Sequence, residues 1–209
     1  MLPIETLVTF FTAAVVLALV PGPDNVFVLT QSAVQGKGAG LAVVMGLCSG
    51  LIGHSIAVAL GVAAIFQTSA LAFTILKYIG AGYLVYLAWQ VFRAPVEKIE
   101  SHSAGAAADY GKLYRRGIIM NITNPKVSIF FLAFLPQFTD PERGSVTIQI
   151  LLLGGIFITA TIIVFGGIAV LAGFLGEWLN RSPRVQNVLN KLAGTIFLGL
   201  ALKLATAQR

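Results

Sequence analysis

Leu19-Val20-Pro21-Gly22-Pro23-Asp24-Asn25 interrupts the first long apolar segment of this chain, and Met120-Asn121-Ile122-Thr123-Asn124-Pro125-Lys126 interrupts another at the matching place in the second half. Proline removes a backbone donor and clashes with the carbonyl one turn back, so a helix should be kinked or broken at both places. Inside a bilayer, the freed backbone groups are tolerated only where they are buried in protein or line a polar cavity. Paired broken helices therefore predict a transport site near the middle of the membrane.

The composition is that of an integral membrane protein. Of the 209 residues, 57% are hydrophobic and only 11% are charged, whereas soluble domains carry about 25% charged residues. No Asp, Glu, Lys or Arg occurs in the ranges 38–76 and 144–176, and each range exceeds the roughly 20 residues that span a hydrocarbon core. The net charge of +6 comes mostly from connections between apolar segments. Basic residues there orient a protein in the membrane, so nucleic-acid binding is not expected.

The predicted fold class is an all-α integral membrane protein with six transmembrane helices. The predicted segments are 4–31, 39–66, 70–92, 115–136, 145–176 and 187–206. A hydrophilic linker, 94–114, is expected to join a first three-helix repeat, 1–93, to a second one, 115–209, within a single transmembrane domain. The start of the chain lacks the positive region of a secretory signal, so the first segment is expected to stay in the mature protein. A five-span arrangement with a re-entrant first segment stays open.

An internal repeat is visible when the two halves are overlaid. Pro23 matches Pro125, and Lys77-Tyr78-Ile79-Gly80 resembles Lys191-Leu192-Ala193-Gly194. Because each half holds an odd number of spans, the two copies should point in opposite directions, which is the inverted symmetry of many carriers. Chance similarity between glycine-rich apolar helices is the alternative. The distribution of Lys and Arg among the loops predicts a cytoplasmic central loop and both termini outside.

Charged residues at the two breaks are the candidate binding groups. Asp24 follows the first break, and Lys126 occupies the equivalent place in the second. A carboxylate at the bilayer centre costs on the order of 3 kcal/mol, so it normally faces a cavity or a partner. Overlaying the prolines sets the acid opposite the base, and such a pair matches the ammonium and carboxylate groups of an amino acid. The alternative for either charge is a place at the membrane interface.

Further residues at the breaks complete the candidate substrate site. The whole set is Pro21, Gly22, Pro23, Asp24, Asn25, Asn121, Asn124, Pro125 and Lys126. The side-chain amides of the asparagines can bind a ligand or cap freed backbone groups. Capping is the expected role of any single asparagine.

The second predicted segment holds a histidine and a small-residue pattern. His54 lies in the middle of this segment, and because the unperturbed pKa of histidine is about 6.5 it is, with Asp24, a candidate for proton coupling. A packing histidine is the alternative. Gly46 and Gly50 form a Gly-xxx-Gly pattern that predicts the close approach of another helix. The lone cysteine, Cys48, is expected to be a packing residue.

Motifs for catalysis and cofactor binding are missing from the sequence. There is no glycine-rich phosphate loop, no pair of histidines at metal-binding spacing and no nucleophile elbow. These motifs supply the backbone amides that bind phosphate, the imidazoles that bind a metal and the activated serine that attacks a substrate. No enzymatic activity, cofactor or metal is therefore expected.

The motifs resemble those of one family, the LysE/RhtB amino-acid exporters. The resemblance rests on Pro21-Gly22-Pro23-Asp24-Asn25-Val26-Phe27-Val28, on 36–50, on 116–126 and on Phe134-Leu135-Pro136-Gln137-Phe138. It covers almost the whole chain and implies a multi-pass permease of the bacterial inner membrane that is driven by the proton gradient. The family's two hallmark elements fall on Pro21-Gly22-Pro23 and on Asn124-Pro125-Lys126. Relatives handle basic, neutral and sulfur-containing amino acids, so the resemblance leaves the substrate open.

The predicted function is that of a secondary active transporter that exports neutral or moderately apolar amino acids, or their derivatives, by antiport with protons. Its expected partners are the amino-acid substrate, protons and the lipid bilayer. The identity of the amino acid and the formation of a homodimer stay open. A passive channel or pore subunit is the main alternative. A membrane enzyme acting on lipid is a third possibility, which the missing catalytic motifs disfavour.

Overall fold

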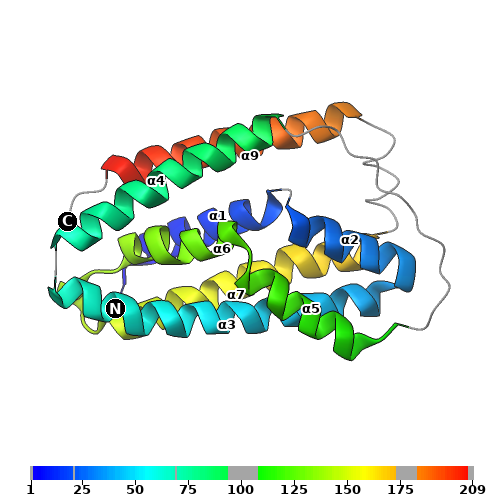
Figure 1. The fold of residues 1–209 in the computed structure, drawn as a ribbon, viewed down its shortest axis with the longest axis horizontal. Helices are drawn as coiled ribbons and strands as arrows, with labels where there is room; N and C mark the ends of the chain where they lie inside the picture. The colour runs from blue at the N-terminus through cyan, green and yellow to red at the C-terminus, as the bar shows by residue number, and fades with distance from the viewer. Residues whose placement is uncertain (1, 21, 69, 94–107, 173–182, 207–209) are drawn as a thin grey trace.

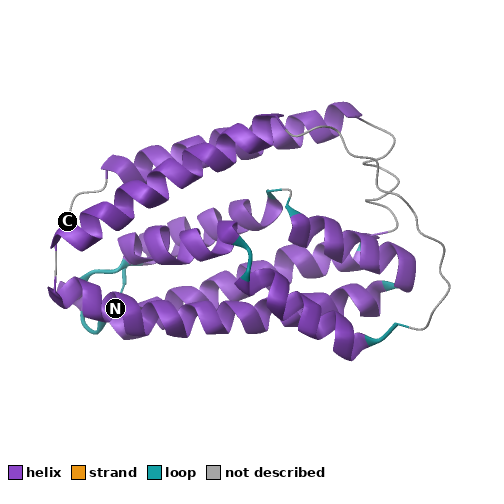
Figure 2. Ribbon diagram, in the orientation of Figure 1, coloured by secondary structure: helices purple, strands orange, loops and turns teal. Residues whose placement is uncertain are grey.

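The computed structural model describes residues 2–20, 22–68, 70–93, 108–172 and 183–206, and every regular element in these ranges is helical (Figures 1 and 2). The α-helices are α1 (Ile4–Leu19), α2 (Pro23–Gln35), α3 (Lys37–Thr68), α4 (Ala70–Arg93), α5 (Tyr110–Ile122), α6 (Pro125–Ile129), α7 (Val146–Val170) and α9 (Pro183–Thr206). A π-helical turn, Phe130–Phe134, and two 3-10 turns, Leu135–Phe138 and Pro141–Arg143, connect α6 to α7.

Helices break at both places where the sequence predicted it. The bend between α1 and α2 is 63°, and the bend between α5 and the helical turns that start with α6 is 50°. Pro23 and Pro125 each take the first position of the following helix, where a missing backbone donor removes no helical hydrogen bond. Pro21, the other proline of the first break, lies outside the described residues.

Two to four membrane spans can be assigned within the described ranges. Two helices, α3 and α7, are long and apolar enough to cross a membrane, and each of the two bent pairs adds one more candidate. The helices α4 and α9 are not in this set, so six spans in two repeats stay a prediction. The fourth predicted segment starts earlier than expected, because α5 begins at Tyr110. Most of the predicted linker, 94–107, lies outside the described residues.

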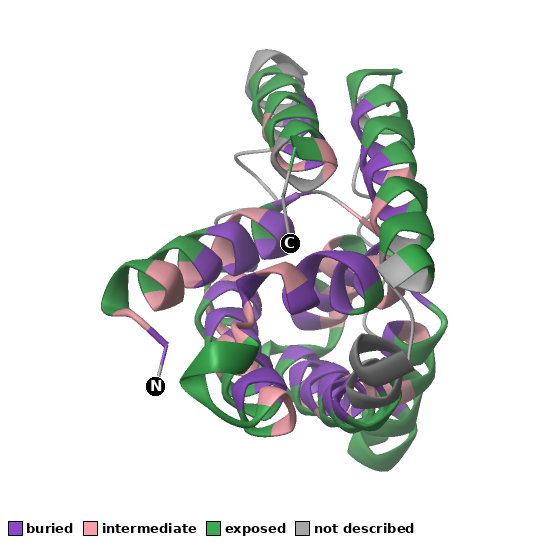
Figure 3. Ribbon diagram, turned by 90° about the vertical axis from the view of Figure 1, so that its left-hand side faces the viewer, coloured by how far each residue is buried: buried purple, intermediate pink, exposed green. Residues whose placement is uncertain are grey.

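The helices run along the long axis of the molecule, and the start of α1 and the end of α9 lie at the same end (Figure 1). On one side α3 packs against α5 and α7, while α4 packs mainly against α9. In the end-on view, buried residues gather where helices face one another and exposed residues lie around the outside (Figure 3). Many of the exposed residues are large and apolar, such as Ile56, Leu60, Ile79 and Ile163, which suits contact with lipid chains.

Glycines let α3 and α5 approach closely. A Cβ atom at Gly46 would collide with the carbonyl oxygen of Tyr114, and one at Gly117 would meet the backbone of α3. A Cβ atom at Gly50 would lie 2.6 Å from Oδ1 of Asn121. The close contact predicted from the Gly-xxx-Gly pattern is therefore present, and it sets the middle of α3 against the second helix break.

Candidate functional site

The two breaks bring their charged side chains together. Nζ of Lys126 lies 3.6 Å from Oδ1 of Asp24, and the two side chains are only 9% and 5% exposed. The separation exceeds that of an ordinary N–H···O hydrogen bond, so the contact is an ion pair without a direct hydrogen bond. The overlay of the two prolines predicted this juxtaposition. Neither charge is exposed in the way that an interfacial side chain would be.

The C-terminal end of α1 supplies the other partners of Lys126. Its ammonium donates to the carbonyl oxygens of Val20, at 3.3 Å, and Leu17, at 3.5 Å. The side-chain amide of Asn25 donates to the carbonyl of Ala18 at 2.7 Å. The last carbonyls of a helix lack intrahelical donors and carry the negative end of the helix dipole. A cation from the second break thus caps a helix of the first.

The helices that follow the breaks begin differently. Asn124 caps α6, because its Oδ1 accepts a hydrogen bond from the backbone N–H of Lys126 at 3.0 Å. Gly22 is the N-cap of α2 and offers no side chain. The positive end of a helix dipole stabilises the carboxylate of Asp24 in the first turn of α2 and opposes the ammonium of Lys126 in the first turn of α6. The ammonium therefore depends on Asp24 and on the carbonyls of α1. The capping role expected of the asparagines is observed for Asn25 and Asn124.

Gly22 lies where the polar side chains converge. A Cβ atom at this position would be 2.9 Å from Oδ1 of Asp24, 3.1 Å from Nζ of Lys126 and 3.7 Å from Oδ1 of Asn25. The backbone of Gly22 is extended, with φ −162° and ψ 175°, a conformation open to any residue. A glycine is needed here because a side chain would take the space of the ion pair, and not because the backbone conformation requires it.

Several buried oxygens around the ion pair have no hydrogen-bond partner among the described residues. They are Oδ1 of Asp24, Oδ1 of Asn25 and Oδ1 of Asn121. Nearly all buried polar atoms in proteins have a partner, so unsatisfied acceptors call for a water or a ligand. Three acceptors without donors suit a ligand that carries several N–H groups.

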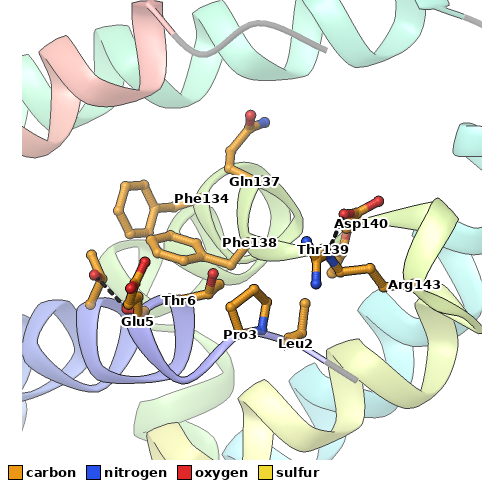
Figure 4. A pocket seen from close by; sticks show the side chains of 11 residues that line it. Leu2, Pro3, Glu5, Thr6, Phe134, Gln137, Phe138, Thr139, Asp140 and Arg143 are labelled. Atoms are coloured by element: carbon orange, nitrogen blue, oxygen red, sulfur yellow. Dashed lines mark hydrogen bonds and ion pairs between the residues drawn. The ribbon is translucent and has the colours of Figure 1, made fainter.

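The free space beside the ion pair is very small. Its volume is about 10 Å³, which is room for about one water. Asp24, Asn121 and Lys126 line it together with apolar side chains and Thr161 of α7. The site is therefore closed in this conformation. A larger cavity of about 450 Å³ lies away from the ion pair, beside the start of α1 (Figure 4).

His54 contacts the second break without lining the space at the ion pair. Its Nε2 lies 3.4 Å from the carbonyl oxygen of Asn121, and its ring centroid is 5.6 Å from that of Phe131. The side chain is half-buried. A role of His54 in proton coupling stays a prediction.

The contribution of α7 to the site was missed by the sequence reasoning. Phe157 and Thr161 of this helix line the space beside the ion pair. Neither residue belongs to a motif. The helix is apolar on all sides, so its periodicity does not show which residues face the break.

Comparisons with known proteins show the family of this chain. The model of the LysE type translocator family matches residues 15–208. A Vibrio cholerae protein named as an uncharacterized membrane protein is 38% identical over 208 residues, which cover 98% of each chain. The homoserine/homoserine lactone efflux proteins of Salmonella typhimurium and Salmonella typhi are each 34% identical over 199 residues, which cover 95% of each chain. No solved structure matches the chain significantly. Because the family model matches residues 15–208, a range that includes both helix breaks, this chain is a membrane protein and belongs to the LysE type translocator family.

Proposed function

We propose that this protein is a secondary active transporter of the bacterial inner membrane that exports neutral amino acids and their derivatives. The observation that carries the proposal is the buried ion pair of Asp24 and Lys126 at two helix breaks. Buried ion pairs often stabilise a protein no better than apolar residues of the same volume. Charged residues within membrane segments mark substrate and ion pathways instead. A role in binding accounts for their presence better than a role in stability.

The ion pair matches the two charges of an amino acid. In the bound state Lys126 holds the carboxylate of the substrate and Asp24 holds its ammonium group. Each protein charge then exchanges one partner for another, so no charge is left uncompensated in the protein interior. The unpartnered oxygens of Asn25 and Asn121 supply further acceptors for the N–H groups of the ammonium.

The surroundings of the ion pair favour a neutral substrate. Among the residues that the structure describes, Asp24 is the one acidic side chain that lines the central space, so no second carboxylate there would bind a basic side chain. Thr161 offers a hydroxyl group to a polar side chain. Homoserine, which the names of two relatives mention, is a neutral amino acid with a hydroxyl group and fits this description.

The transport cycle follows from the two-repeat arrangement of the helices. The chain forms six spans in two inverted three-helix repeats, 1–93 and 115–209, joined by the linker 94–114. Two features support the repeat: Pro23 and Pro125 begin equivalent half-helices, and Lys77 and Lys191 both lie about two turns into helices that pack together. Rocking of one repeat against the other opens the closed site alternately to the two sides.

Proton antiport supplies the energy for export. A proton that neutralises Asp24 weakens its hold on the substrate ammonium and so favours release. His54, which contacts the second break through Asn121, is the second candidate for the proton. Protonation can drive the cycle only by changing the relative stability of two conformations.

The test is counterflow of radiolabelled L-homoserine and L-homoserine lactone in proteoliposomes, with and without an imposed proton gradient. The lactone has an amino group but no carboxylate. Lys126→Gln should therefore lower homoserine transport by about tenfold or more, equivalent to roughly 1.4 kcal/mol, and lower lactone transport much less. Asp24→Asn should lower the transport of both compounds. His54→Gln should reduce the stimulation by the proton gradient.

Controls separate binding from folding. Each single variant leaves one buried charge unpaired, which lowers the free energy of unfolding by about 3–5 kcal/mol. The double variant Asp24→Asn, Lys126→Gln removes both charges and is therefore measured as well. Size-exclusion chromatography checks that every variant is folded. Lys37→Gln and Glu142→Gln make the same charge changes at exposed positions and should transport like the unmodified protein. Normal transport of both compounds by the Asp24 and Lys126 variants would contradict the proposal. A passive pore would instead give flux without counterflow or response to the gradient.

A further inference from the structure

A second cavity lies at the end of the molecule where α1 begins. Its volume of about 450 Å³ falls within the range of small-molecule sites, whereas the space at the ion pair holds about one water. One wall comes from the start of α1, with Glu5, Thr6 and Thr9, and the other comes from the segment between the π-helical turn and α7. In this conformation, therefore, the cavity and not the ion pair has room for an amino acid.

The lining of the cavity combines both charges with an apolar surface. Figure 4 shows Glu5 on α1, the rings of Phe134 and Phe138 above Glu5, and Arg143 across from them on the segment before α7. The carboxylate of Glu5 makes no ion pair with a residue that the structure describes. Nε of Arg143 donates to Oδ2 of Asp140 at 2.8 Å in an ion pair, and Asp140 lines the cavity as well. A guanidinium has five N–H donors, so Arg143 can contact a substrate carboxylate while it stays paired with Asp140.

The segment that carries Arg143 is held in place by a buried side chain. Gln149 of α7 accepts a hydrogen bond from the backbone N–H of Asp140 at 2.8 Å and donates to the carbonyls of Asp140, at 2.8 Å, and Gly144, at 3.2 Å. A binding group on such a fixed segment loses less conformational freedom when a ligand binds.

Aromatic rings separate the cavity from the ion pair. Phe134, which lines the cavity, contacts Phe130 at 4.8 Å between ring centroids, and Phe130 contacts Phe157 at 5.3 Å. Phe157 in turn lines the space at the ion pair. Phe130 and Phe134 are the first and last residues of the π-helical turn, and π-turns within helices are frequent at functional sites. Thr6 lines the cavity and Leu17 lines the central space, and the two residues are about 16 Å apart along α1.

We propose that this cavity is an outer binding site for the exported amino acid, which occupies it after leaving the ion pair. Glu5 binds the ammonium group, Arg143 binds the carboxylate, and the rings of Phe134 and Phe138 contact the carbon chain. Phe130 and Phe134 form the barrier between the two sites. The inference rests on the proposed export function and adds to it a second site with its own residues.

Binding of radiolabelled L-homoserine to purified protein tests the outer site, with Lys126→Gln as the background because this change disables the central site. Homoserine should still bind to this variant, and adding Arg143→Gln or Glu5→Gln should weaken binding by about tenfold, whereas Arg143→Lys should retain much of it. Lys37→Gln and Glu142→Gln, which lie outside the cavity, should leave binding unchanged. Loss of all binding both in the Lys126→Gln variant and in the double variant Asp24→Asn, Lys126→Gln, each eluting as folded protein in size-exclusion chromatography, would overturn the proposal. Binding that neither Arg143→Gln nor Glu5→Gln weakens would overturn it as well. Full homoserine export by Lys126→Gln alone would instead count against the central site.

Thiol labelling gives a readout that a purely structural role would not affect. In a Cys48→Ala background, homoserine should slow the reaction of Thr6→Cys with a charged methanethiosulfonate and should not slow that of Lys37→Cys. Thr161→Cys, behind the aromatic barrier, should react slowly, and Phe134→Leu should speed this reaction several-fold. Equal rates for Thr6→Cys with and without homoserine would overturn the outer site, and fast labelling of Thr161→Cys with Phe134 intact would overturn the barrier.

Discussion

At the scale of single residues, the site is built from charges that compensate helix ends. Lys126 caps the carbonyls of α1 while it pairs with Asp24, and Asn124 caps the helix to which Lys126 belongs. Because each of the two charges has a partner of opposite charge or polarity beside it, the protein interior tolerates both charges. Gly22 keeps the space in which these groups meet.

Gly22→Ala should impair transport while the protein still folds. The new methyl group would lie 2.9 Å from Oδ1 of Asp24 and 3.1 Å from Nζ of Lys126, so the side chains must move apart, although the extended backbone accepts alanine. We expect homoserine counterflow to fall by about tenfold with little change in the midpoint of thermal unfolding in detergent. Gly155→Ala, where a Cβ atom meets nothing within 4 Å, is the matched control. Unchanged counterflow in Gly22→Ala would show that the packing around the ion pair is unimportant.

At the scale of elements, two kinds of irregularity position the site. The helix breaks create free backbone groups at the middle of the bundle, and the close glycine contact between α3 and α5 holds the second break in place. The π-helical turn then directs Phe130 and Phe134 between the ion pair and the outer cavity. The two helices of the first break pack against α7, α5 before the second break packs against α3, and the π-helical turn packs against α4 and α3.

Gly46→Ala should destabilise the protein, because the added methyl group would collide with the backbone carbonyl of Tyr114, which cannot move independently of α5. Overpacking of this kind costs about 1–3 kcal/mol, so the midpoint of thermal unfolding in detergent should fall. Gly53→Ala, on the same helix in open space, should unfold at the normal temperature or slightly above it, since alanine favours helix. Equal midpoints for the two variants would mean that α3 and α5 do not depend on this contact.

At the scale of the whole molecule, charge distinguishes the two ends of the bundle. The end that holds the junctions of α2 with α3 and of the central linker with α5 carries Lys37, Lys112, Arg115 and Arg116, whereas the described segment beside the outer cavity carries Arg143 with Asp140 and Glu142. Basic residues are retained on the cytoplasmic side of a membrane. The outer cavity is therefore expected to face away from the cytoplasm, the direction in which an exporter releases its substrate.

Cysteine labelling in intact cells tests this orientation. In a Cys48→Ala background, Glu142→Cys should react with a membrane-impermeant maleimide added outside, and Lys37→Cys should react only after the membrane is permeabilised. Both positions are exposed, so accessibility to the two compartments is the main difference between them. The protein with Cys48→Ala alone should stay unlabelled. The reverse pattern would place the cavity on the cytoplasmic side and make it an entry site.

The sequence by itself determined the membrane character of the chain and the positions of both breaks, because composition and the missing proline donor act locally. It also identified Asp24 and Lys126 as opposed charges. Only the tertiary structure decided that the two charges meet at 3.6 Å and that Phe157 and Thr161 of α7 line the central space. The same holds for the contact of His54 with the backbone of the second break and for the larger cavity beside the start of α1. These features depend on packing between segments that are far apart in the chain, which no local pattern encodes.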